Sequence, residues 1–284
     1  MGFRPVVEVV TGQETSDGAG VRLKRVIGTR ELDHLDPFLL LDEFRSDDAG
    51  DYIAGFPDHP HRGFETVTYM LAGSMRHRDH KGNQGDLVAG SVQWMTAGRG
   101  IIHSEMPQQK DGLMWGFQLW VNLPAKEKMR APRYQDIPPE RILEVRPRDG
   151  IRLRVIAGEW DGLRGPVEGI VTQPLYLDVS MAPGARFEYP VPAGHTAFAY
   201  AFEGAGEFGA TDAGAGRRLG AGSLAVLGEG DAVRVVTAGS PVRFLLLAAQ
   251  PLREPIARYG PFVMTTRQEI MQAIQDLQDG TFLD

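Results

Sequence analysis

The chain contains no cysteine among its 284 residues. Disulfides, thiolate metal ligands and a cysteine nucleophile are therefore excluded, and any metal site must use His, Asp or Glu. The chain also lacks an apolar run long enough to cross a membrane, and its first residues, MGFRPVVEVVTG, lack the apolar core of a signal peptide. We therefore expect a cytoplasmic protein with no membrane partner.

The chain has fewer positively charged than negatively charged side chains. The sequence has 30 Lys and Arg against 37 Asp and Glu, which gives a formal net charge of −7. This balance disfavours a broad phosphate-binding surface, and no run of Lys or Arg resembles a nucleic-acid-binding arm. We expect no direct contact with nucleic acid.

Helical periodicity is sparse and is convincing only near the end of the chain. Residues 266–269 (TRQE) fit a capping box, Ile270, Ile274 and Leu277 share one helical face, and Gly280 suits a C-terminal stop. No apolar stripe indicates an oligomer interface, so a monomer is expected.

Short alternating segments dominate the rest of the sequence. With 35 Gly and 19 Pro, they are broken frequently by turn residues. Many short strands at this spacing predict an all-β sandwich or barrel. The clearest candidates are residues 65–71, 116–123, 151–156, 175–179 and 242–248.

An internal repeat predicts two domains. Residues 90–98 (GSVQWMTAG) and 222–230 (GSLAVLGEG) share glycine spacing and apolar pattern at a separation near half the chain. Between them, residues 125–148 are charged and proline-rich, as in a connection between domains. We expect tandem β-domains at 1–135 and 136–284.

Histidines gather in the first repeat only. In PDHPHRGFE, His59 and His61 are two residues apart, and His103 and Glu105 repeat this spacing. In a strand, residues two apart point to the same side, so all four could face one interior. The repeat places Val235 on His103, so a metal site is predicted in the N-terminal domain alone.

Imidazole with carboxylate is a donor set for one divalent transition metal. Without thiolate, the residues leave Fe, Ni, Cu, Mn, Co and Zn open. Iron is the first expectation, because non-haem iron is commonly held by two His and one carboxylate with open positions.

These stretches resemble a known family. PDHPHRGFETVTYMLAGS followed by GSVQWMTAGRGIIHSE is similar to the two motifs of cupins, in their pirin subfamily. Further pirin-like stretches are LDPFLLLDEF, GFQLWVNLP and YGPFVM. The resemblance implies a bicupin, with two β-sandwich (jelly-roll) barrels, a short C-terminal helix, and a degenerate second barrel without metal.

The resemblance also bears on the fourth ligand. The general cupin pattern would use Glu65, whereas pirins use the glutamate two residues after the second-motif histidine, which is Glu105 here. We expect His59, His61, His103 and Glu105 to be the metal ligands. Glu65 is then expected to hold a ligand or a bound water.

Three functions follow from the resemblance and the site. Some pirins resemble quercetin 2,3-dioxygenases, which implies a phenolic (flavonol) substrate, O2, ring opening with release of carbon monoxide, and Glu105 as general base. The alternative is a metal- or redox-dependent regulator that binds a protein partner, as a transcription cofactor or on a metabolic enzyme. A third reading is an isomerase or hydrolase acting on an unrelated small molecule.

Other polar residues have ordinary interpretations. Arg62 and Arg99 could attract an anionic substrate or simply be solvated, and Gln118 and Trp120 could line the cavity. Four histidines are expected to be hydrogen-bonded or solvated residues rather than ligands: His34, His77, His80 and His195.

Overall fold

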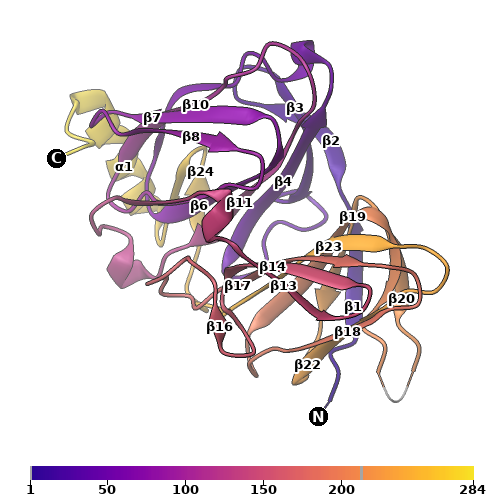
Figure 1. Ribbon diagram of the computed structural model, residues 1–284. Coiled ribbons are helices and arrows are strands. Elements are labelled where there is room, and N and C mark those ends of the chain that lie inside the picture. Colours follow the sequence, from indigo (N-terminus) through magenta and orange to yellow (C-terminus); the bar gives the residue numbers. More distant parts are fainter. Residues whose placement is uncertain (1, 212–213) are drawn as a thin grey trace. The chain divides into compact units, whose positions relative to one another are not determined.

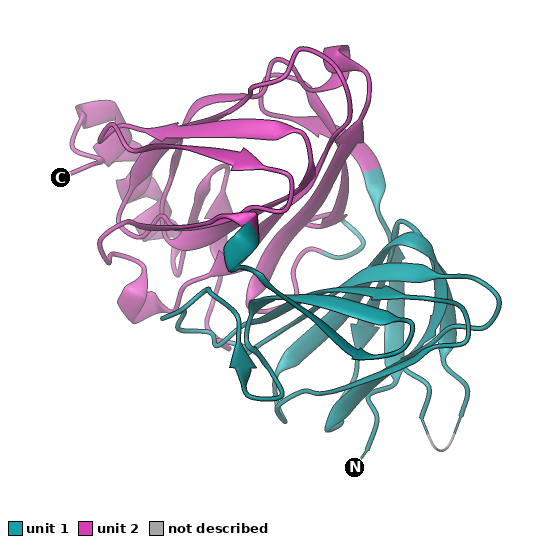
Figure 2. Cartoon of the chain, viewed as in Figure 1, with its two compact units in different colours: residues 1–13, 30–32, 140–251 teal, residues 14–29, 33–139, 252–284 magenta. Residues whose placement is uncertain are grey.

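The computed structural model describes residues 2–211 and 214–284 of the chain (Figure 1). It divides into two compact units that each contain segments from both halves of the chain (Figure 2). The N-terminal unit comprises Glu14–Thr29, Asp33–Pro139 and Leu252–Asp284, and the C-terminal unit comprises Met1–Gln13, Arg30–Leu32 and Glu140–Pro251.

The division into contiguous segments 1–135 and 136–284 therefore differs from these compact units. The middle boundary lies near residue 139, but each unit takes in a terminal segment that the sequence assigned to the other. The reason is strand pairing: β1 (Val6–Thr11) pairs with β21 (Ser223–Leu227) inside the C-terminal unit.

The N-terminal unit contains a seven-stranded and a four-stranded antiparallel sheet. The larger sheet has the order β12-β9-β6-β11-β4-β3-β2, and the smaller has the order β5-β10-β7-β8. Their bounds are β2 (Gln13–Asp17), β3 (Val21–Ile27), β4 (Phe38–Ser46), β5 (Phe56–His61), β6 (Phe64–Ala72), β7 (Ser74–Asp79), β8 (Gln84–Val88), β9 (Val92–Thr96), β10 (Ile101–Pro107), β11 (Met114–Asn122) and β12 (Arg133–Ile137).

The C-terminal unit is built on a ten-stranded sheet with the path β1-β21-β19-β23-β17-β14-β13. Alternate side chains of its strands form one apolar core that includes Leu153, Leu177, Phe244 and Leu246. The remaining bounds are β13 (Leu143–Arg148), β14 (Ile151–Ala157), β15 (Glu159–Trp160), β16 (Leu163–Arg164), β17 (Leu175–Met181), β18 (Arg186–Pro190), β19 (Thr196–Phe208), β20 (Arg217–Gly220), β22 (Ala232–Val236) and β23 (Val242–Ala249).

All five strand predictions are confirmed, as β6, β11, β14, β17 and β23. The repeat is confirmed as well. Gly90 and Gly222 occupy equivalent turns, with φ of 88° and 85°, immediately before β9 and β21. Glycine fits both positions because positive φ carries no steric cost without a Cβ.

The stretch at 125–148 is more than a connection. It contains β12, which pairs with β9 at the edge of the seven-stranded sheet, and β13, which pairs with β14 in the other unit. Short 3-10 turns at Ala125–Glu127 and Pro139–Arg141 accompany them. Proline and charge are compatible with edge strands, which is why composition alone is misleading here.

The C-terminal segment adds β24 (Ala257–Tyr259), β25 (Phe262–Met264) and helix α1 (Arg267–Asp279) to the N-terminal unit. The capping box between Thr266 and Glu269 is present, and Gly280 ends the helix with a φ of 76°. Ile270 and Ala273 are buried, whereas Leu277 is 38% exposed and does not belong to the packed face. Within residues 2–211 and 214–284, none of the helices is long and apolar enough to span a membrane.

Candidate metal centre

Three histidines converge because β10 pairs with β5 in the four-stranded sheet. The antiparallel register places His103 directly opposite His59, with His61 two residues along the same strand. Their ring centroids lie 4.5 to 5.1 Å apart. One ring nitrogen from each of His59, His61 and His103 lies within 4.8 Å of the others.

The donor atoms suit a divalent metal ion. Nδ1 of His59 lies 2.8 Å from the Pro57 carbonyl oxygen, a bond that fixes the ring and leaves Nε2 for a metal. By contrast, Nδ1 of His61 and both ring nitrogens of His103 are buried without a hydrogen-bond partner. Buried polar atoms are rarely left unpaired, so these orphans indicate a missing ligand.

Burial also favours the neutral form of two of these imidazoles, those of His61 and His103. Burial lowers the pKa of His61 and His103 well below the ordinary histidine value, and the neighbouring histidines lower it further. Neutral imidazole is the metal-binding form, so the site is electrostatically prepared for a cation.

Glu105 lies two residues after His103 on the same face of β10. Its Oε1 accepts a hydrogen bond of 2.9 Å from the Thr68 hydroxyl, and its side chain is buried. The group of ligand atoms that lie within 4.8 Å of one another contains the three histidines and does not include Glu105. The structure thus places Glu105 next to His103 on β10, with its carboxylate hydrogen-bonded to Thr68 of the seven-stranded sheet.

Glu65 does not lie beside the histidines, contrary to the role expected for it. On β6 it alternates with Thr66 and Thr68, so it points to the opposite face of the sheet from the Thr68–Glu105 contact. Its carboxylate accepts hydrogen bonds from Trp94 (3.1 Å) and Thr96 (2.6 Å). Burial raises its pKa against these bonds.

A cavity of about 620 Å³ opens in front of the histidines, within the range typical of small-molecule sites. Gln118 and Trp120 line it, as expected, together with His59, His61 and Glu105. Its apolar wall is formed by Leu23, Leu40, Phe44, Phe56, Met75 and Trp120.

Arg62 has a structural role rather than an anion-attracting one. It is 4% exposed, donates to Asp276 (2.5 Å) and to the Phe282 and Arg99 carbonyls, and stacks on the Phe282 ring. The residue that follows the histidine pair therefore anchors α1 and the C-terminus. Neither loop solvation nor substrate attraction describes it.

His77 is another departure from expectation. It was expected to be a hydrogen-bonded or solvated residue, but it is 1% exposed on β7, where it pairs across the strands with Glu105. It stacks on Tyr134 and its Nε2 lies 3.3 Å from Asp136. In the β7 sequence SMRHRD every second side chain is buried, so the strand alternation, and not the polarity of the segment, would have predicted that His77 is buried.

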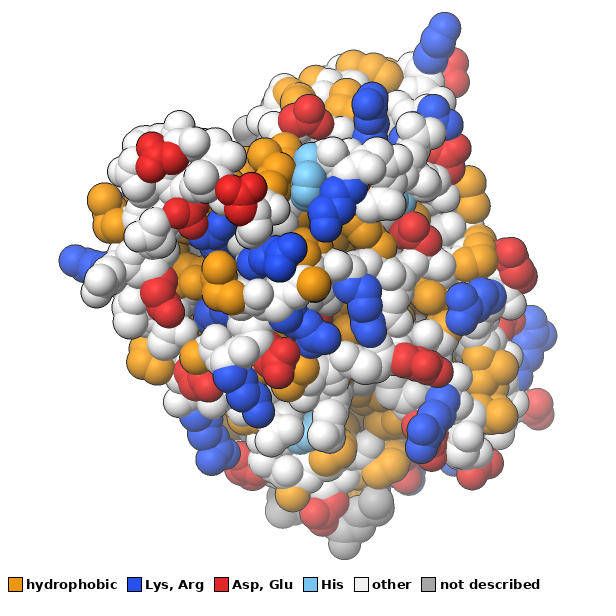
Figure 3. All heavy atoms as spheres, turned by 90° about the vertical axis from the view of Figure 1, so that its left-hand side faces the viewer, with side chains coloured by type: hydrophobic (Ala, Val, Ile, Leu, Met, Phe, Trp, Pro, Cys, Tyr) orange, Lys and Arg blue, Asp and Glu red, His pale blue; other side chains and the backbone are white. Residues whose placement is uncertain are grey.

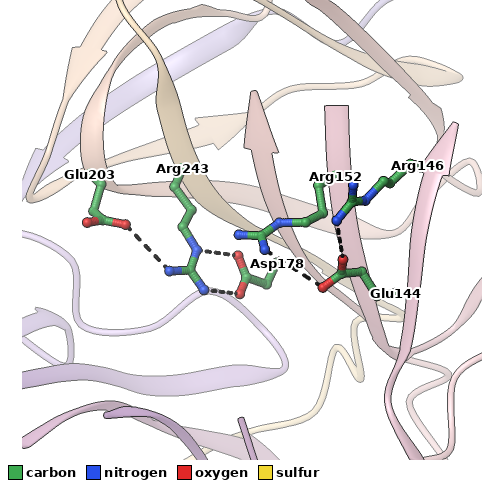
Figure 4. A network of polar contacts seen from close by, with 6 residues as sticks. All are labelled: Glu144, Arg146, Arg152, Asp178, Glu203 and Arg243. Carbon is green, nitrogen blue, oxygen red and sulfur yellow. Dashed lines mark hydrogen bonds and ion pairs between the residues drawn. The ribbon is translucent and has the colours of Figure 1, made fainter. Parts of the chain in front are cut away.

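The C-terminal unit carries charge but, among its described residues, no comparable group of metal-ligating atoms. Charged side chains on one face of its sheet pair with one another (Figure 4): Arg243 with Asp178 and Glu203, and Glu144 with Arg146 and Arg152. On the face shown in Figure 3, basic and acidic side chains are likewise interspersed.

Two segments of the chain match known family models. Residues 20–121 match the model described as pirin, and residues 176–283 match the pirin C-terminal cupin domain. The chain belongs to the pirin family. Its two units are accordingly cupin domains, as the motifs had implied.

Several relatives cover nearly all of this pirin. A pirin-like protein of Caulobacter vibrioides is 51% identical over 99% of this chain and 100% of its own length. A protein of Pseudomonas aeruginosa, named as a candidate quercetin 2,3-dioxygenase, is 49% identical over 98% of each chain. Human pirin is 47% identical over 95% of this chain and 91% of its own.

A solved structure has the same architecture. The crystal structure of quercetin 2,3-dioxygenase from Acinetobacter baumannii superposes with a TM-score of 0.88 at 35% sequence identity, over 99% of this chain and 98% of that one.

The sequence did not predict the polar side chains on the cavity wall that the seven-stranded sheet forms. Thr68, Arg25 and Asp42 face the cavity or its residues from three strands of the seven-stranded sheet. The sequence did offer evidence for Asp42, because the two adjacent acids inside the apolar run FLLLDEF, Asp42 and Glu43, must be paired if the run is buried. No local signal marked Arg25 or Thr68.

Proposed function

We propose that this pirin is a metal-dependent dioxygenase that opens the central ring of flavonols, with one divalent ion, iron first among the candidates, in the N-terminal cupin. The observation that carries the proposal is the combination at one place of three converging imidazoles, two of them buried with unpaired ring nitrogens, a buried carboxylate and a mostly apolar cavity of about 620 Å³. The names of two similar proteins support the same substrate class.

In this proposal His59, His61 and His103 hold the metal and Glu105 is the fourth ligand. A metal bound there supplies Lewis-acid polarisation of the flavonol hydroxyl and the electronic coupling that lets dioxygen react with a phenolic substrate. The imidazoles keep their positions because β5 and β10, which carry them, are paired neighbours in one sheet.

Glu105 is also the proposed general base. Its position on the cavity wall allows its carboxylate to take the proton of the flavonol hydroxyl. The Thr68 hydroxyl donates to Oε1, so Oε2 is the oxygen left for either role, metal ligand or proton acceptor. The apolar wall excludes water from the electron-rich substrate and limits wasteful hydrolysis.

Two measurements on Glu105 separate its two roles. In Glu105→Gln we expect turnover to fall by about a hundredfold or more, since general-base catalysis contributes on that order. Metal content measured on purified protein reports the ligand role. If Glu105→Ala retains the wild-type metal content, Glu105 is not a ligand and acts as base alone.

The proposal is tested by following quercetin loss in air and under argon with metal-loaded protein. We expect turnover in air only, and none in His103→Gln, where the metal is lost. Turnover that continues under argon would contradict a dioxygenase and favour an isomerase or hydrolase.

A redox-responsive regulator that binds a protein partner is the second candidate, because similar proteins such as human pirin are named without an activity. This candidate predicts capture of a partner that depends on the metal's oxidation state, with no turnover of any phenol.

A further inference from the structure

A row of polar side chains crosses the cavity wall formed by the seven-stranded sheet, among the apolar side chains of the same strands. Strands β3, β4, β11 and β6 are neighbours in the seven-stranded sheet (Figure 1). Their registers pair Arg25 with Asp42, Asp42 with Gln118, and Gln118 with Thr68. Cross-strand partners point to the same side, so these four side chains form one continuous row, here called the polar row.

The polar row ends at the metal site. Oγ1 of Thr68 lies 2.9 Å from Oε1 of Glu105 and 2.7 Å from the Gln118 side-chain oxygen. The other end is an ion pair. Nε and Nη2 of Arg25 donate to the two carboxylate oxygens of Asp42 at 2.9 and 2.7 Å.

The ion pair lies two strands away from Thr68, which is the end of the polar row at the metal site. Adjacent strands are about 4.8 Å apart, so the two strand spacings between Thr68 and Asp42 correspond to about 10 Å. A three-ring flavonol spans a comparable length between its metal-binding hydroxyl and the hydroxyls of its pendant phenyl ring. A substrate placed at the metal would reach Asp42 with that pendant ring.

The ion pair retains unused hydrogen-bonding capacity toward the cavity. Each Asp42 oxygen receives one bond from Arg25, while a carboxylate offers about four lone-pair sites. Nη2 of Arg25 also donates to Asp17, and within residues 2–211 and 214–284 its Nη1 makes no hydrogen bond. Asp42 and Arg25 both line the cavity, with Asp42 only 3% exposed.

The positive and negative side chains at the Arg25–Asp42 end of the cavity are equal in number. This balance indicates which class of ligand group the end can bind. Asp17 and Asp42 balance Arg25 and Arg258, and Arg258 is also placed over the Trp120 ring, 4.9 Å from its centroid. The other acids that line the cavity, Asp58 and Glu105, belong to the histidine-bearing strands β5 and β10. A balanced set of donors and acceptors suits neutral hydroxyl groups better than a carboxylate or phosphate.

We infer that the Arg25–Asp42 pair is a specificity subsite that binds hydroxyl groups on the substrate ring remote from the metal. Asp42 accepts from these hydroxyls and Nη1 of Arg25 donates to them. The inference rests on the proposed function for the orientation of the substrate, but it concerns binding and can be measured without turnover.

The test compares two flavonols that differ only at the remote ring: quercetin, and galangin, which lacks both hydroxyls of the pendant ring. Quenching of tryptophan fluorescence, with Trp120 in the cavity wall, gives the dissociation constant of each. We expect the wild type to bind quercetin about tenfold more tightly, as for one or two net hydrogen bonds.

The variant Arg25→Met with Asp42→Leu removes the subsite without leaving a buried charge, an exchange that cores often tolerate. We expect it to bind both flavonols with the galangin affinity of the wild type. Asp42→Asn should lose part of the preference. The matched control is Lys24→Met on the same strand, which pairs with Glu14 and does not line the cavity; it should keep the preference.

The outcomes separate the two proposals. Equal wild-type affinities, no binding of either flavonol, or a preference that survives in the double variant would overturn the subsite. A quercetin preference that the double variant abolishes, without turnover of either flavonol in air, would support the subsite and contradict the dioxygenase. The comparison of quercetin with galangin uses the wild type alone, so it still tests the subsite if the double variant folds poorly.

Discussion

At the scale of single residues, the histidine cluster could be predicted and the position of Glu65 could not. The spacing of His59 with His61 is local, so a strand alone puts them on one side. Extending the same rule to Glu65 fails because the chain turns at Gly63, where φ is 89°, and passes from the four-stranded to the seven-stranded sheet. The rule that residues two apart share a face holds within one strand and does not extend across a turn that joins two sheets.

This placement predicts that Glu65 is dispensable for metal binding. In Glu65→Gln the hydrogen bonds from Trp94 and Thr96 are weakened on the far face of β6, so stability should fall by about 1 to 3 kcal/mol. Metal content, measured by mass spectrometry of the purified protein, should equal that of the wild type. The matched control, His103→Gln, should lose the metal; a comparable loss in Glu65→Gln would refute the geometry.

Thr68 should act on catalysis through Glu105. A hydroxyl carries one proton, and it donates to the carboxylate when the Gln118 amide turns its nitrogen toward Thr68. Thr68→Val keeps the shape and removes the bond, so kcat for quercetin should fall by about tenfold or more with little change in KM. Thr68→Ser restores the hydroxyl and should recover most of kcat. Equal losses in both variants would indicate a packing role only.

Lys128 makes stability depend on pH. Its buried Nζ donates to the carbonyls of Gly63 (2.8 Å) and Val263 (3.0 Å) and to Oδ1 of Asn122 (2.6 Å), and burial lowers its pKa from 10.5 to about 8. Between these values the unfolded chain binds more protons than the folded chain. The free energy of unfolding should therefore rise with pH across this window.

Urea denaturation at pH values from about 8 to about 10 measures this slope. We expect it to be smaller in Lys128→Met, whose overall stability also drops because three acceptors lose their donor. A slope that is the same in the variant as in the wild type would show that Lys128 keeps an ordinary pKa in the fold.

At the scale of elements, local signals predicted strands and the helix, and missed where the terminal elements pack. The capping box and Gly280 were sufficient for α1 because caps are encoded within a few residues. The assignment of β24, β25 and α1 to the N-terminal unit depends on distant partners, such as Arg62 with Asp276. Such pairs have no signature in a single sequence.

These elements should be essential to the metal centre although they follow the second domain in sequence. Val263 is fully buried and packs with Leu39 and Phe64, and Phe64 contacts His61 at 5.0 Å between ring centroids. A chain that ends at Pro251 should lose bound metal and the hydrogen-exchange protection of β6 and β11. Protection of β19 and β23, which belong to the other unit, should persist. Retention of metal would contradict the division into units.

At the scale of the whole molecule, the chain is a bicupin in which, among the described residues, only the N-terminal unit holds a candidate metal centre. The repeat predicted this asymmetry from the residues that replace the histidines, such as Val235, now buried in the core of the C-terminal unit. What could not be predicted is the polar row, because it is assembled by register across four strands. Cross-strand register is set by the complete sheet and not by any one segment.

The most direct test of the central claim is the gas balance of quercetin turnover by the metal-loaded protein. We predict that oxygen consumed, carbon monoxide released and quercetin lost are equimolar, and that all three vanish in His103→Gln. Loss of quercetin without carbon monoxide, or with equal rates in the His103 variant, would show that the three-histidine centre is not a flavonol dioxygenase.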